Sequence, residues 1–80
     1  MKYTYEEVKE KLKEEGVEED RVESLLNVIV VEYNNLARNG YCKMKGEKLK
    51  IPDWNEFLFS ITAFDDACGP YTEKDVRMAK

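Results

Sequence analysis

The chain of 80 residues contains no histidine. This absence removes the most common general base and metal ligand, and with them every nucleophile arrangement that depends on histidine. Neither the P-loop pattern nor the GxGxxG pattern of phosphate-binding loops occurs. The adjacent carboxylates Asp65 and Asp66 have no partner base, so we expect them to be exposed helix charges. The sequence predicts a protein that is not an enzyme and binds neither a metal ion nor a cofactor.

Cysteine and long apolar runs are also scarce. The two cysteines, Cys42 and Cys68, are too few for a disulfide scaffold and lack the spacing of a zinc site. We expect both thiols to be buried as small apolar groups, and the sequence leaves a disulfide between them open. No apolar run approaches the roughly 20 residues of a membrane span, and the polar first residues do not form a secretory signal. We therefore expect a cytoplasmic protein that does not bind a membrane.

The remaining composition fits one small globular domain over residues 1–80. Hydrophobic residues make up 42% of the chain and aromatic residues 11%, which argues against disorder. The net charge is −4, so the protein is acidic overall. A domain of this length buries only about 60% of the surface of its unfolded chain, so its core must be small.

Two helices are predicted in the first half of the chain. Thr4 and Glu7 have the spacing of a capping box, which begins a first helix that ends at Gly16. Apolar residues then recur at helical spacing over residues 18–38, and Asn39 with Gly40 forms a stop signal. We interpret this segment as one long helix.

A third helix is predicted in the second half of the chain. Asp53 and Glu56 repeat the capping-box pattern, and Gly69 followed by Pro70 ends the helix. Because this segment is the most apolar one, we expect it to lie at the centre of the core. Thr72 is expected to cap a last short turn before frayed terminal residues.

Residues 42–51 alternate between apolar and basic on both sides of Gly46. This pattern predicts a β-hairpin with a two-residue turn at Gly46 and Glu47, in which Met44 lies opposite Leu49. A two-stranded ribbon is marginal by itself, so its apolar face must pack on the helices. The predicted fold is α+β and mainly helical: helix, helix, β-hairpin, helix and a short C-terminal helical turn.

The other face of the hairpin consists of lysines. Residues 38–50 carry five basic side chains against one acidic side chain, whereas residues 1–24 carry nine acidic against five basic ones. The lysines could bind nucleic-acid phosphates, or they could protect a sheet edge from aggregation. The acidic net charge and the lack of aromatic residues on this face favour the second interpretation. The nucleic-acid alternative depends on Lys43, Lys45, Lys48 and Lys50.

A third feature is the amount of apolar surface for such a short chain. The second predicted helix has an outer face poor in charge, and Phe59, Ala63 and Ala67 form a second stripe on the third. One small core cannot use all of this surface, so we expect a protein partner, including a second copy in a homodimer. The main interpretation is a small protein-binding module of the adaptor or inhibitor type, such as the accessory proteins of phages. The expected contact residues are Val28, Val31, Asn34 and Phe59.

Overall fold

The structure, a computed structural model, describes residues 2–46 and 48–79. These residues form a mainly helical α+β fold, as the sequence predicted. The helices are α1 (Tyr5–Glu14), α2 (Glu19–Val31), α3 (Tyr33–Arg38), α4 (Trp54–Cys68) and α5 (Glu73–Ala79). The strands are β1 (Lys2–Tyr3), β2 (Lys43–Lys45) and β3 (Lys48–Lys50). No described helix is long and apolar enough to cross a membrane.

Both predicted N-cap residues accept a hydrogen bond from their helix, and Thr4 with Glu7 forms the full capping box. The Glu7 amide donates to the Thr4 hydroxyl at 3.1 Å, and the Thr4 amide donates to the Glu7 carboxylate at 3.0 Å. At the start of α4, the Glu56 amide donates to the Asp53 carboxylate at 3.1 Å. Each cap satisfies backbone donors that a helix leaves unpaired, and is worth about 1 kcal/mol.

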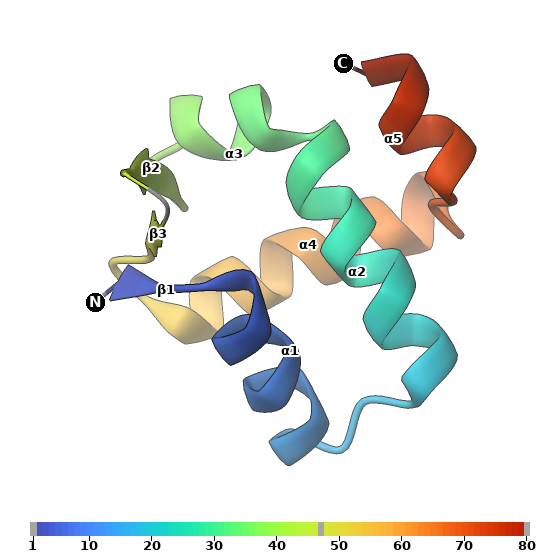
Figure 1. The fold of residues 1–80 in the computed structure, drawn as a ribbon, viewed down its shortest axis with the longest axis horizontal. Coiled ribbons are helices and arrows are strands. Elements are labelled where there is room, and N and C mark those ends of the chain that lie inside the picture. Colours follow the sequence, from blue (N-terminus) through green and yellow to red (C-terminus); the bar gives the residue numbers. More distant parts are fainter. Residues whose placement is uncertain (1, 47, 80) are drawn as a thin grey trace.

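The long second helix was predicted wrongly, because the chain breaks it into α2 and α3. Glu32 separates the two with φ −101° and ψ 18°, which is outside the helical region. The break follows four consecutive β-branched residues (28–31), which crowd a helical turn. Figure 1 shows α3 turning from the axis of α2 toward β2. The Tyr33 hydroxyl then accepts a hydrogen bond from the Met44 amide at 2.7 Å, so the break connects the helices to the sheet.

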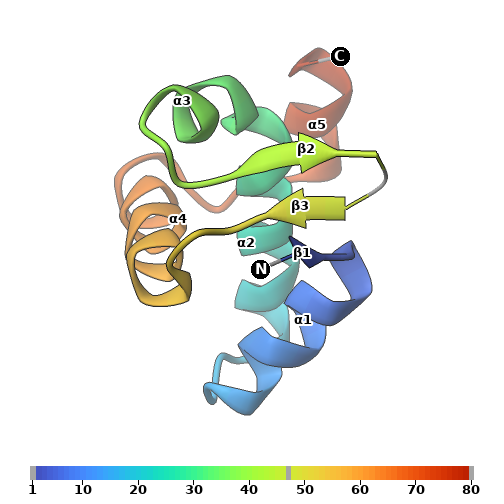
Figure 2. The same ribbon diagram turned by 90° about the vertical axis from the view of Figure 1, so that its left-hand side faces the viewer.

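The hairpin was predicted correctly, but the sheet has a third strand. Met44 pairs with Leu49, and Gly46 has the positive φ (+67°) that the turn requires. The predicted turn residue Glu47 lies outside the described residues. The first strand, β1, adds antiparallel to β3, which gives the order β1-β3-β2. In this order β3 is the central strand. Figure 2 shows the sheet in front of α2.

The core lies between the sheet and the helices, around α2. Helix α2 packs against α1, α4 and α5, and the inner face of the sheet closes another side. Cys42, Leu49 and Ile51 bring the hairpin into this core, as predicted. The prediction was wrong for Met44, which belongs to the same apolar face but is 45% exposed. The other fully buried apolar residues are Val8, Leu12, Val22, Leu25, Val28, Ile29, Leu36, Phe57 and Ile61.

The loop between α4 and α5 is fastened to α2. The Ser24 hydroxyl donates to the Asp65 carboxylate and accepts a hydrogen bond from the Tyr71 amide at 2.8 Å. The Asn27 side chain donates to the Tyr71 carbonyl at 2.9 Å. Tyr71 is buried, and burial together with nearby negative charge raises the pKa of its hydroxyl to about 12. The C-terminal segment is therefore part of the fold rather than a frayed tail.

Arg21 completes this connection. Its guanidinium donates to the carboxylate of Asp65 at 3.1 Å and to that of Asp66 at 2.6 Å. The prediction that both aspartates are exposed was right for Asp66 and wrong for Asp65, whose side chain is only 11% exposed. The Thr72 amide donates to the Asp75 carboxylate at 2.8 Å, and the Thr72 hydroxyl donates to it at 3.2 Å. The short predicted turn after Thr72 is a helix of seven residues.

Candidate functional site

The predicted contact residue Val28 is completely buried and cannot meet a partner. Val28 lies on the same face of α2 as Ser24 and Val31, because the three are spaced four and three residues apart. The Tyr71 segment and α5 cover this face, which the sequence analysis had assigned to the outside. The prediction was wrong because only a short turn was expected after the third helix, and such a turn would leave this face of α2 uncovered.

The other three predicted contact residues do not form one surface. Val31 is partly buried and lines a depression beside Tyr71 and Met78 of α5. Asn34 is exposed on α3, beyond the break at Glu32. Phe59 lies on α4, where 76% of it is exposed. The predicted face on the second helix is therefore absent, and Phe59 is the one member with a large exposed apolar side chain.

Phe59 lies in a shallow groove of about 360 Å³ on the outer side of α4. We call this depression the Phe59 groove. Its lining contains no charged residue, although charged residues make up 38% of the chain. The lining residues are Asn39, Tyr41, Phe59, Ser60, Ala63, Phe64 and Ala67. The predicted stripe of Phe59, Ala63 and Ala67 thus forms one wall, and the segment after α3 forms the other.

The sequence analysis missed Tyr41 and Phe64 as parts of this surface. Tyr41 precedes the buried Cys42, and in an extended segment successive side chains point to opposite sides. That alternation was the available signal for Tyr41. Phe64 is partly buried against the core and also faces the groove.

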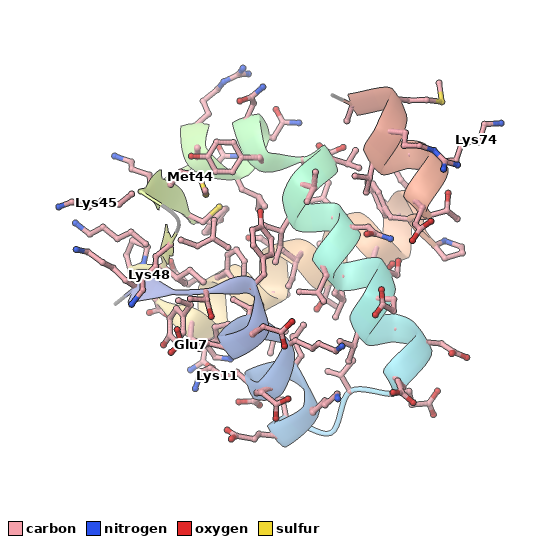
Figure 3. All side chains as sticks on the ribbon, in the orientation of Figure 1. Glu7, Lys11, Met44, Lys45, Lys48 and Lys74 are labelled. Atoms are coloured by element: carbon pink, nitrogen blue, oxygen red, sulfur yellow. The ribbon has the colours of Figure 1, made fainter. Side chains whose placement is uncertain are left out.

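The second exposed feature is the solvent face of the sheet. Lys2 of β1 pairs with Lys50, and Lys50 also pairs with Lys43 of β2. Lys45 pairs with Lys48 across the turn. All five lysines are exposed, and Figure 3 shows Lys45 and Lys48 extending into solvent. We call these residues the lysine face, which contains the four predicted lysines and adds Lys2.

Few acidic groups balance this charge. The two ion pairs found within residues 2–46 and 48–79 both involve Arg21, so neither contains a lysine of this face. Glu7 lies near enough to Lys48 for the lysine to help lower the carboxyl pKa, although the hydrogen bonds from Thr4 are the main cause. The lysine face is thus a cationic surface, and its acidic neighbour Glu7 is already engaged in a helix cap.

The two cysteines are free and differ in environment. Cys42 is buried, and burial raises the pKa of its thiol to about 11. At neutral pH this thiol is protonated and therefore a poor nucleophile. Cys68 is exposed near the end of α4, so the prediction that both thiols are buried was wrong for Cys68. This position lies beyond the last fully buried residue of α4, Ile61, by almost two helical turns.

Comparisons with known proteins give no assignment. No protein-family model matches the chain, and no curated protein or solved structure matches it significantly. Within the described parts of the chain, no three cysteine, aspartate or glutamate side chains gather as a metal site would require. The Phe59 groove and the lysine face are therefore the features on which a function can be argued.

Proposed function

We propose that this chain is a protein-binding module, and that its Phe59 groove binds the same groove of a second copy. The observation that carries this proposal is the exposed Phe59 in a lining without charge. Fully burying a phenylalanine side chain is worth about 1.5–3 kcal/mol. In the monomer Phe59 remains exposed and most of this free energy is not gained, whereas contact with an apolar partner surface would bury the ring.

The spacing of the groove residues favours a second copy as the occupant. Phe59, Ala63 and Ala67 are four residues apart and form a straight stripe along α4. In an antiparallel pair with its two-fold axis at Ala63, Phe59 of each copy meets Ala67 of the other. Such a contact is self-complementary, and the small alanines allow the helix axes to approach to about 8 Å.

Charge does not oppose this pairing. The acidic side chain nearest the stripe in sequence is Asp66, which precedes Ala67. Its carboxylate is paired with Arg21 at 2.6 Å, so its charge is partly neutralised before a second copy approaches. The lining of the groove has no charged group that would be desolvated on association.

The size of the groove limits the strength of the dimer. A standard interface buries about 800 Å² per partner. The accessible surface of the monomer is 5371 Å², so such an interface would cover about one seventh of it. A helix of 15 residues offers only part of that area, and we therefore expect a dimer with a Kd on the order of micromolar.

Sedimentation equilibrium over a wide concentration range tests this proposal. The native chain is expected to move from monomer to dimer as concentration rises, and Phe59→Ser to remain a monomer. Met78→Ser is the matched control, because Met78 is 75% exposed on α5, outside the groove. This control should dimerise as the native chain does. A native chain that stays monomeric throughout, or a Phe59→Ser variant that associates normally, would overturn the proposal.

A further inference from the structure

We propose that the lysine face binds the phosphate backbone of a nucleic-acid duplex without reading its sequence. This inference is independent of the dimer and uses a different surface. Five lysines share the solvent face of the sheet, and β1, β2 and β3 each contribute at least one. Lysine is a point charge that attracts phosphate at any sequence, and such contacts supply most of non-specific binding.

The strand order argues against edge protection as the purpose of these lysines. Lysines on an edge strand prevent two sheets from pairing edge to edge. The two edges here are β1 and β2, whereas β3 is paired on both sides. Edge protection therefore does not explain Lys50 of the central strand, which pairs with Lys2 on one side and with Lys43 on the other.

The register adds a cost that an anionic ligand would remove. Lys43 and Lys2 both pair with Lys50, and Lys45 pairs with Lys48, so every lysine of the face has a like charge opposite it. Like charges in directly opposed positions destabilise a sheet, and an acidic residue at either position would stabilise it. A row of phosphates between the lysines would convert this repulsion into attraction.

The chemistry of the face also indicates what it does not do. Its residues are all lysines, so no aromatic ring is available for stacking and no amide for pairing with a base edge. The face therefore suits a duplex, whose phosphates are outside, better than a single strand bound through its bases. DNA and RNA duplexes both offer this chemistry.

The acidic net charge of the chain does not cancel the face, because charge is segregated. Five acidic residues lie at the end of α1, in the loop that follows and at the start of α2. Figure 1 shows that this end of α1 points away from the sheet. A duplex would attract the lysine face and repel this end, so the field orients the protein during approach. These acidic residues are Glu14, Glu15, Glu18, Glu19 and Asp20.

Fluorescence anisotropy with a labelled DNA duplex of mixed sequence, begun at low salt, tests the inference. The logarithm of affinity should fall as the logarithm of salt concentration rises. With five phosphate contacts, this slope should be no steeper than about −4.5. The double variant Lys45→Glu with Lys50→Glu should lose at least about tenfold in affinity at low salt. An RNA duplex of matched length shows which backbone is preferred, and binding to either supports the inference.

The matched control is Lys13→Glu with Lys74→Glu, which changes the net charge equally. Both lysines are exposed on helices outside the sheet, and Figure 3 shows Lys74 on the far side of the molecule. This control should lose less than about threefold, since only long-range charge has changed. The inference is overturned if neither duplex is bound at low salt, or if both double variants weaken equally. It is also overturned if anionic phospholipid vesicles are bound and both duplexes are not.

Discussion

The inner and outer faces of α4 carry the same side chain in opposite environments. Phe57 is completely buried, and Phe59, only two residues later, is 76% exposed. Two residues rotate a helix by roughly 200°, so these rings point in nearly opposite directions. The inner face holds the fold together, and the outer face contributes little to the monomer. The difference separates the apolar residues that the core needs from those that the monomer leaves exposed.

Replacing each phenylalanine by alanine gives the sharpest contrast between the two faces. Phe57→Ala should lower the free energy of unfolding by about 3–5 kcal/mol, because it leaves a cavity in the core. This loss approaches the whole stability expected of so small a domain. Phe59→Ala should change the free energy of unfolding by less than about 0.5 kcal/mol at concentrations where the chain is monomeric. Urea denaturation followed by circular dichroism measures both, and equal losses would contradict the division of α4 into two faces.

Burial also affects a titrating group, the thiol of Cys42. In the unfolded chain Cys42 ionises near its ordinary pKa, whereas in the folded chain its pKa is about 11. The unfolded state therefore releases the proton first, and stability falls as pH rises from about 9 to 11, by up to about 2–3 kcal/mol. Below pH 9 this contribution is fully present.

Denaturation midpoints measured across this pH range provide the check. Tyr71, whose pKa is also raised, acts in the same direction. The Cys42 contribution is therefore measured as a difference between two slopes of stability against pH, that of the native chain and that of Cys42→Ala. A native slope in Cys42→Ala would show that the thiol is not shielded from solvent.

A smaller effect is expected where α5 is fastened to α2. Ser24→Ala removes the acceptor of the buried Tyr71 amide and a donor to Asp65, which should cost about 1–2 kcal/mol. Asp66→Asn breaks only an exposed ion pair and should cost less than about 1 kcal/mol. Thermal unfolding compares the two variants. A larger loss in Asp66→Asn would mean that the exposed ion pair between α2 and α4, not the hydrogen bonds of Ser24, contributes more to holding this end of α4 against α2.

Local signals in the sequence predicted what short-range geometry determines. The caps at Thr4 and Asp53 and the register of Met44 with Leu49 each follow from residues a few positions apart. The third strand was missed because β1 has only two residues, too few to show an alternation. Its pairing with β3 depends on contacts between residues separated by more than half the length of the chain.

The candidate site was predicted only in part, for a related reason. Phe59 and the four hairpin lysines are exposed as expected. Val28 was predicted at the surface because no local pattern indicates that α5 covers that side of α2. The hydrogen bonds of Ser24 and Asn27 to Tyr71 fix that cover, and they join residues more than 40 positions apart. Helical periodicity does not reveal such a contact.

The most direct test of the proposed pairing of α4 helices is cross-linking at its two-fold axis. In a Cys68→Ser background, Ala63→Cys places two thiols face to face across the axis, within reach of a disulfide. Asn55→Cys is the control, because its two copies would lie about 24 Å apart along the antiparallel helices. Mild oxidation should give covalent dimer from Ala63→Cys and not from Asn55→Cys. Equal cross-linking of both variants, or none from either, would contradict the proposed pairing through the Phe59 groove.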